Sequence, residues 1–149
     1  MTEQDHSELL NGLRKGFDAA MGLRYTKATL DELAVEVDVR EVHHQQYGLV
    51  HGGVYAGLIE TLCSAGAALN AMARGQTGAV GLENTTSFLR AVRNGTLTAR
   101  ARPLVRGRRT QVWEAEVRDE HGRLCATGRV RLLNTNRGDE IGGAEVKVS

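Results

Sequence analysis

Two kinds of residue in one segment of this sequence point to chemistry: the glycine pair Gly52-Gly53 and the carboxylate Glu60. Glycine lets the backbone approach another group closely, and the first N–H groups of a helix that follows the pair would be free to donate to a bound oxygen. Glu60 lies inside an otherwise apolar run, where a carboxylate can accept a proton or attack a carbonyl. A polarising N–H and a carboxylate are two parts of a hydrolytic site.

The run from residue 54 to residue 73 is the element that must position these groups. Its only ionisable side chains are Tyr55, Glu60 and Cys63, and its many aliphatic residues leave no broad polar face for water. The glycine pair before it and Arg74-Gly75 after it are typical of the start and the end of a helix. The sequence therefore predicts one long, buried helix.

The spacing within this helix limits how its groups can act together. Gly52 and Glu60 are eight positions apart, which at about 1.5 Å per residue separates them by roughly 12 Å along the axis. Catalytic groups must lie within about 3 Å of the reacting atoms. If both groups act on one carbonyl, they come from two chains whose helices pack antiparallel. Ser64 lies one turn after Glu60 on the same face and can hydrogen-bond near it.

Two other interpretations of the segment are weaker. An apolar run of about 20 residues with Gly53 and Gly57 four apart resembles a membrane helix, but a carboxylate in its middle is costly in lipid. His43, His44 and His51 are candidate metal ligands with the carboxylate, but adjacent histidines on extended chain point to opposite faces, and the spacing matches no zinc motif. We therefore expect neither a membrane span nor a metal site.

Two alternatives concern the ionisable residues themselves. Taken alone, Glu60 could be a structural carboxylate that its neighbours satisfy, and the sequence leaves this open. Cys63, three positions later, could be a thiol nucleophile. A small cysteine on an apolar helix is more often part of the core, so the thiol mechanism is disfavoured.

Composition limits the classes of partner. The chain has 149 residues, a net charge of +1 and 4% aromatic residues, which predicts one domain and argues against a nucleic acid partner, since polyanions attract basic patches and bases stack on aromatic rings. The polar, acidic start does not resemble a secretory signal. Cys63 and Cys125 form no disulfide framework, so we expect a cytoplasmic protein.

The remaining segments read as strands around the central helix. Residues 7–21 are predicted to form an amphipathic helix. Alternating apolar and polar residues predict strands at residues 23–28, 33–39, 79–92, 97–105, 110–118 and 124–133. Pro103 indicates an edge or a bulge. We predict an α+β fold in which an antiparallel sheet wraps around one long central helix. Residues 1–134 form this domain, and residues 135–149 are expected to be a flexible tail.

One motif makes the architecture recognisable. The order Gln-x-x-Gly-Leu-Val-His-Gly-Gly, from Gln45 to Gly53, leads into Glu60 within the predicted helix. This arrangement resembles the hotdog-fold acyl-CoA thioesterases, and it is similar to their phenylacetate-pathway type and to the glutamate-using 4-hydroxybenzoyl-CoA thioesterases. The resemblance extends from about Gly22 to Leu133. It implies hydrolysis of an aromatic or medium-chain acyl-CoA to the free acid and coenzyme A, without a metal or redox cofactor.

The resemblance also implies roles for individual residues. The N–H of Gly52 would polarise the thioester carbonyl, and Glu60 of the partner chain would be the nucleophile or the general base. Gln45 would lie beside the carbonyl. Ser64 would help to hold the acyl end or the water, and His51 matches the family histidine.

A coenzyme A site and an oligomer are the remaining implications. Arg90 ends the strand that faces the site, and Arg109 with Thr110 follows a tight turn, so the three are predicted to converge on the coenzyme A phosphates. A dimer with shared active sites is expected, and a dimer of such dimers. Two alternatives stay open: a non-catalytic acyl-CoA-binding or regulatory module of this fold, and a hotdog hydratase or dehydratase. The second is disfavoured because Ala65, not a histidine, follows Glu60 by about one helical turn.

Overall fold

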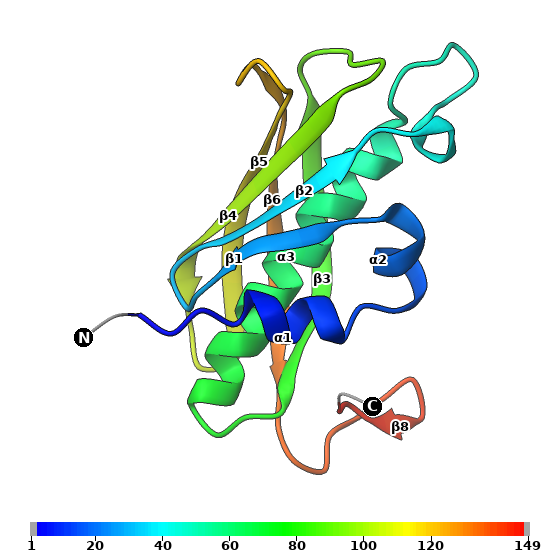
Figure 1. Ribbon diagram of the computed structural model, residues 1–149. Coiled ribbons are helices and arrows are strands. Elements are labelled where there is room, and N and C mark those ends of the chain that lie inside the picture. Colours follow the sequence, from blue (N-terminus) through cyan, green and yellow to red (C-terminus); the bar gives the residue numbers. More distant parts are fainter. Residues whose placement is uncertain (1–2, 148–149) are drawn as a thin grey trace.

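The computed structural model describes residues 3–147. Its elements are α1 (Ser7–Gly12), α2 (Gly16–Met21), β1 (Arg24–Ala28), β2 (Leu33–Asp38), a 3-10 turn η1 (Glu41–His43), α3 (Gly52–Ala73), β3 (Gly78–Phe88), β4 (Thr96–Arg106), β5 (Thr110–Arg118), β6 (Leu124–Thr135), β7 (Glu140–Ile141) and β8 (Ala144–Glu145). The first six strands form one antiparallel sheet in the order β1-β2-β4-β5-β6-β3, which wraps around α3 (Figure 1). The predicted α+β architecture with one central helix is confirmed.

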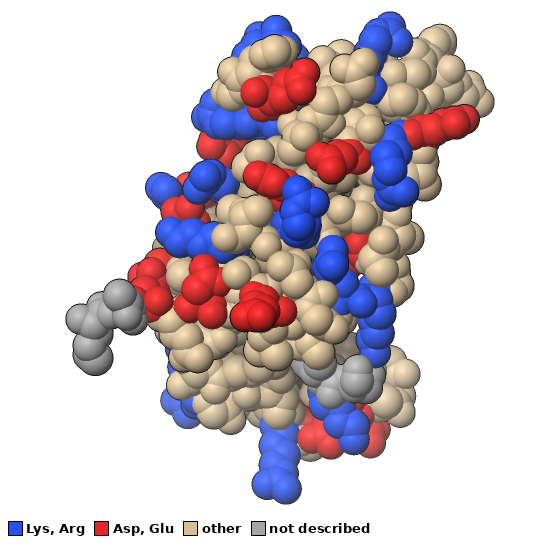
Figure 2. Space-filling model, viewed as in Figure 1, with Lys and Arg blue, Asp and Glu red and all other residues tan. Residues whose placement is uncertain are grey.

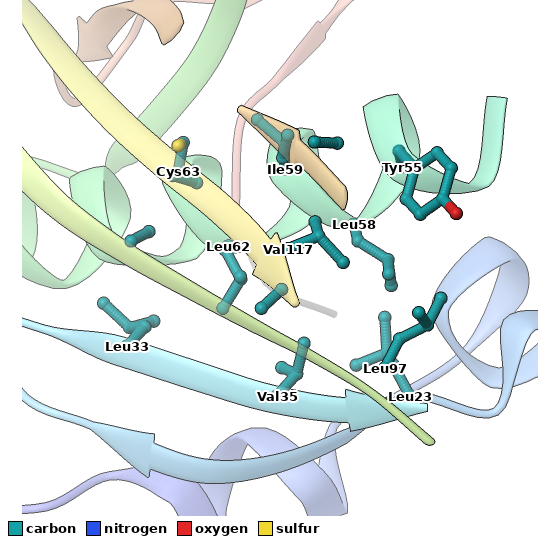
Figure 3. Close-up of a cluster of buried hydrophobic side chains, with 14 of the residues drawn as sticks. Leu23, Leu33, Val35, Tyr55, Leu58, Ile59, Leu62, Cys63, Leu97 and Val117 are labelled. Atoms are coloured by element: carbon teal, nitrogen blue, oxygen red, sulfur yellow. The ribbon is translucent and has the colours of Figure 1, made fainter. Parts of the chain in front are cut away.

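Helix α3 carries the centre of the hydrophobic core. Its buried side chains lie against the inner face of the sheet, and Figure 3 shows Leu62 of the helix towards Leu33 and Val35 of β2, and Leu58 near Leu97 of β4. Each fully buried aliphatic side chain of this kind contributes about 1.5–3 kcal/mol. Although the helix has the length and composition of a membrane span, it is the core helix that the sheet covers.

A buried polar network fastens the C-terminal half of α3 to the sheet. Gln111 of β5 is fully buried, and its amide nitrogen donates to the Ala67 carbonyl of α3 at 2.9 Å and to Asn134 Oδ1 of β6 at 2.8 Å. Trp113 donates its indole N–H to Gln111 Oε1 at 2.9 Å. Because every polar group in this network has a partner, burial costs little and the helix is held at one depth.

The N-terminal segment differs from the prediction. The single helix expected at residues 7–21 is wrong, because the chain forms two short helices with a bend between them. Asn11 of α1 exchanges two hydrogen bonds with the Tyr25 backbone of β1, at 2.9 and 2.8 Å. Asp18 of α2 instead accepts a hydrogen bond from Thr61 of α3 at 2.8 Å. Between the two helices Lys15 is extended, with φ −154° and ψ 173°, and Gly16 has φ +57°, so the helix is interrupted there.

The strands follow their predicted ranges within a few residues. β3 ends at Phe88, earlier than expected, and β6 continues to Thr135, so it crosses the expected boundary after residue 134. Beyond it, β7 and β8 pair as a small separate sheet. The register of β4 shifts between Pro103 and Val105, which confirms the bulge that the proline indicates.

Charges of both signs are interspersed over the molecular face shown in Figure 2. One group of them joins the β1–β2 turn to β4: Glu32 accepts from Arg100 and Arg102, both at 2.8 Å. Burial raises the pKa of Glu32, but hydrogen bonds and charges from Arg102, Lys27 and Arg100 outweigh it and hold the pKa below its ordinary value. Such pairs stabilise the hairpin locally and form no single-sign surface.

Gly66 allows α3 to lie close to the sheet. A Cβ at this position would be 2.5 Å from Trp113 Cη2 and 2.8 Å from Leu33 Cδ1, which is closer than carbon atoms approach. We expect Gly66→Ala to lower the free energy of unfolding by about 1–3 kcal/mol through overpacking, although alanine gains about 1 kcal/mol in helix propensity. Urea denaturation would measure it. Gly12→Ala is the control, because nothing lies within 4 Å of its Cβ, and equal stability of the two variants would contradict this packing argument.

Candidate active site

The N-terminus of α3 exposes one free backbone donor. His51 caps the helix, and its Nδ1 accepts from the Gly53 N–H at 2.7 Å. The Val54 N–H donates to the His51 carbonyl at 2.9 Å. Within residues 3–147, the Gly52 N–H has no acceptor. The helix start therefore offers the Gly52 N–H to a bound oxygen, and His51 acts on the helix cap.

An aromatic side chain lies over this donor. A Cβ at Gly52 would be 2.7 Å from Phe88 Cζ, so a larger residue would displace the ring. Phe88 is 59% exposed and lies 6.1 Å, centroid to centroid, from the Tyr55 ring. The free N–H of Gly52 consequently has an apolar wall on one side, where an acyl group can be shielded from water.

Hydrogen bonds hold the Glu60 carboxylate on two sides. Asn84 of β3 donates from Nδ2 to Glu60 Oε2 at 3.0 Å. Ser64 donates to Glu60 Oε1 at 3.4 Å, which is long for a hydrogen bond. A Cβ at Gly81 would collide with Glu60 Oε1, so glycine at this position of β3 leaves room for the carboxylate in its present place. Glu60 is half-buried, and its carboxylate is fixed by β3 as much as by its own helix.

A β-bulge in β3 puts these partners on the helix side. Gly81 pairs with Leu132 and Glu83 with Arg131, so Leu82 is an extra residue in the strand. Side chains alternate along a strand, and one extra residue reverses the alternation. Both Gly81 and Asn84 therefore face α3, although three positions separate them. The family resemblance places the segment from Asn84 to Arg90 on the strand that faces the site, but sequence alternation assigns Gly81 and Asn84 to opposite faces, so the contact between Asn84 and Glu60 was not predicted.

Gln45 lies close to the helix start. Its Oε1 accepts from the backbone N–H groups of Tyr47 and Leu49, at 2.5 and 3.3 Å, which shapes the loop before α3. A hollow of about 390 Å³ is lined by Gln45, His51, His44, Gln46 and Tyr47. Gln45 and His51 thus lie together at the N-terminus of α3, as the motif predicts. Glu60 lies further along the same helix.

The predicted coenzyme A residues are not brought together within one chain. The Arg90 N–H donates to the Cys125 carbonyl at 3.2 Å, at the Phe88 end of β3. Arg109 lies at the other end, where its carbonyl accepts from the Asn134 N–H at 2.8 Å, and Thr110 pairs with Leu133. About ten strand residues, or roughly 30 Å, separate the two ends. Within a single chain, therefore, Arg90 does not converge with Arg109 and Thr110, and the prediction is corrected on this point.

Other candidate groups take no part in this geometry. Cys63 is buried in the core, and burial raises the pKa of its thiol well above the ordinary value. A protonated core thiol is a poor nucleophile. In the described part of the chain, no three His, Cys, Asp or Glu side chains gather in a metal-binding cluster. In this part of the chain, the Gly52 N–H and the Glu60 carboxylate remain the candidate reactive groups.

Comparison with known proteins agrees with this geometry. Residues 47–126 match the family model described as the thioesterase superfamily. The chain belongs to this superfamily. Rv1847 of Mycobacterium tuberculosis is 40% identical over 119 residues, which cover 79% of this chain and 85% of that protein. The proofreading thioesterase EntH of Cronobacter turicensis is 39% identical over 110 residues, covering 74% and 79% of the two chains.

The fold of the thioesterase is shared by solved structures as well. The structure of thioesterase HI1161 from Haemophilus influenzae has a TM-score of 0.83 and 31% identity, and the match covers 94% of this chain and 96% of that one. Membership of the superfamily makes thioester hydrolysis the reaction class of this chain. It agrees with a site that consists of a polarising N–H and a carboxylate.

Proposed function

We propose that this thioesterase hydrolyses an aromatic or medium-chain acyl-CoA to the free acid and coenzyme A. One observation carries the proposal: the helix start presents the unused N–H of Gly52, and the same helix presents a single carboxylate, Glu60, which β3 holds in place. These are the two groups that acyl transfer to water requires, one for the developing oxyanion and one for the nucleophile.

Two chemical routes use these groups. In one, Glu60 takes a proton from water, the hydroxide attacks the thioester carbon, and the proton passes to the departing thiolate of coenzyme A. In the other, the carboxylate attacks the carbonyl, the C–S bond breaks and coenzyme A leaves as its thiolate, and a mixed anhydride remains. Water then hydrolyses the anhydride to the free acid and the Glu60 carboxylate, and the proton released goes to the thiolate. The carbonyl oxygen accepts from the Gly52 N–H in both routes, and the helix dipole stabilises its negative charge.

The shared site has a structural basis in β3. This strand is at the edge of the sheet and pairs only with β6, so its other edge can pair with a second copy. Gly52 lies beside Phe88, and Glu60 lies beside Gly81 and Asn84. Antiparallel pairing of two β3 edges about a two-fold axis between these positions brings Gly52 of one chain towards Glu60 of the other.

The same pairing supports a shared coenzyme A site. An antiparallel β3 edge places the Arg90 end of one chain near the Arg109 and Thr110 end of its partner. The three residues then converge between chains, although they do not within one. The apolar wall formed by Phe88 and Tyr55 favours an aromatic or aliphatic acyl group at the Gly52 end.

A dimer of dimers and a cytoplasmic location complete the proposal. The outer face of the sheet carries exposed charges of opposite sign on neighbouring strands, such as Glu114 opposite Arg129. Such a face is complementary to a second copy of itself across a two-fold axis. Both cysteines of the chain are unpaired thiols, which suits a reducing compartment.

Removing the carboxylate tests the chemistry. We expect Glu60→Gln to lower kcat for acyl-CoA hydrolysis by about 10³-fold or more, because neither route proceeds without the carboxylate. Thiol release would be measured across a panel of aryl and fatty acyl-CoA thioesters. Cys63→Ala is the matched control on the same helix and should retain most activity. Near-normal turnover by Glu60→Gln would contradict the role of Glu60 as nucleophile or general base. If the wild type hydrolyses none of the substrates, the acyl-CoA-binding module is favoured instead.

Subunit mixing tests the shared site. Glu60→Ala and Gln45→Ala chains are each expected to be inactive. If they are refolded together, half of the dimers are mixed, and each mixed dimer has one intact site, so about one quarter of wild-type activity should return. Mass spectrometry would verify the mixed dimers. Verified mixed dimers without activity would mean that Gln45 and Glu60 act within one chain.

A substrate comparison tests the coenzyme A contacts. A solvent-exposed contact between Arg109 and a phosphate contributes about 1–2 kcal/mol, so Arg109→Ala should raise KM for acyl-CoA by roughly 5- to 30-fold and leave kcat unchanged. The same acyl group on pantetheine, which lacks the nucleotide, should be hydrolysed normally. Arg24→Ala removes an equal charge on the edge strand β1, which β2 and β4 separate from β5, and serves as the control. Equal losses on both substrates would show that Arg109 supports the fold or the acyl site instead.

A further inference from the structure

Asn84 makes an unusually complete set of hydrogen bonds beside the carboxylate. Its Nδ2 donates to Glu60 Oε2 at 3.0 Å and to the Ala56 carbonyl at 3.1 Å. Its Oδ1 accepts from Thr86 Oγ1 at 2.7 Å. A flipped amide would turn Oδ1 towards two acceptors and Nδ2 towards the hydroxyl, so the three partners define one orientation of the side chain.

We propose that Asn84 is a positioning residue for Glu60 and that Thr86 acts on the carboxylate only through Asn84. The inference rests on the proposed role of Glu60 in hydrolysis and goes beyond it. The last torsion of a glutamate side chain is broad, and Glu60 is only half-buried. A charge-assisted hydrogen bond from an amide of fixed orientation removes that freedom and aims the carboxylate at one place.

The backbone around this relay has glycine where each member needs room. A Cβ at Gly81 would collide with Glu60 Oε1, and a Cβ at Gly128 would be 2.8 Å from Thr86 Oγ1. Thr86 and Gly128 are register partners on β3 and β6. The bulge at Leu82 sets the face on which Asn84 and Thr86 lie. The glycines at 81 and 128 and the bulge at Leu82 thus give Glu60, Asn84 and Thr86 the room and the direction for their contacts.

Ser64 holds the other carboxylate oxygen less tightly. Its hydroxyl is 3.4 Å from Glu60 Oε1, against 3.0 Å for Asn84 and Oε2. Ser64 also lies on the same helix as Glu60, so it cannot fix the carboxylate relative to the sheet. Asn84 links Glu60 to β3, the edge strand at which the partner chain is proposed to pair. The orientation of the carboxylate towards the partner's Gly52 N–H therefore depends on Asn84.

The test separates the hydrogen bond from the shape of the side chain. Asn84→Asp is isosteric but replaces the donor by a second carboxylate, and Asn84→Leu removes all polar atoms. We expect each to lower kcat by about 10- to 100-fold, because misplacement of a catalytic group by about 1 Å has effects of this size. KM, the melting temperature and the oligomeric state should stay near their wild-type values. Thr85→Val is the matched control, since Thr85 lies on the outer face of the same strand.

A double-mutant cycle tests the relay. Thr86→Val should lower kcat by a smaller factor, about 3- to 10-fold, and the variant with both Asn84→Leu and Thr86→Val should be no slower than Asn84→Leu alone. Multiplied losses would show that Thr86 acts independently of Asn84. A wild-type kcat in Asn84→Leu would overturn the positioning role, because this variant has neither a donor nor a charge beside Glu60.

Crystal structures test the contact between Asn84 and Glu60 independently of the proposed function. If the wild type hydrolyses no thioester, the proposed function fails, and crystal structures of the wild type and Asn84→Asp still decide the contact. We expect the Glu60 carboxylate to move away from β3 in the variant. A carboxylate that keeps its position in Asn84→Asp would overturn the inference whatever the substrate.

Discussion

The packing of α3 against the inner face of the sheet is the interaction on which the rest of the structure depends. Gly66 admits the Trp113 ring against the helix backbone, and Gln111 ties the same half of the helix to β5 and β6. A helix is stiff over this length, so fixing its C-terminal half fixes the direction of its N-terminus and the height of Glu60 above the strands. The positions of the Gly52 N–H and the Glu60 carboxylate therefore depend on the packing of the core.

The helix start combines capping with chemistry. His51 and the ordinary helical hydrogen bonds use the neighbouring donors and leave the Gly52 N–H free. The ring of Phe88 covers one side of that donor. A dipole next to apolar surface interacts more strongly with a carbonyl oxygen than the same dipole in water does, because the local dielectric is lower. His51 thus caps the helix and leaves the Gly52 N–H as its free donor.

If Gly52 and Glu60 act on one carbonyl, the distance between them requires a second copy of the chain. An open β3 edge with exposed Leu82, Phe88 and Leu89 is a liability in an isolated chain. Pairing of two such edges would cover these side chains, and it would also bring together groups that one rigid helix keeps about 12 Å apart. Burial of the edge and assembly of the site would then depend on the same contact.

Much of this protein can be inferred from local patterns. The long apolar run and its flanking glycines determined α3 almost to the residue, and alternating residues located the strands, because periodicity and turn chemistry are local properties. Gly52, Glu60 and Ser64 could be named as candidates for the same reason. Tertiary structure alone decided which strand partners meet the carboxylate, because the bulge at Leu82 reverses the faces of β3 and depends on pairing with β6. It also bent the N-terminal segment between two docking sites, and it placed Arg90 and Arg109 at opposite ends of the sheet. Register and distance between strands arise from contacts between residues far apart in the chain, and no local pattern records them.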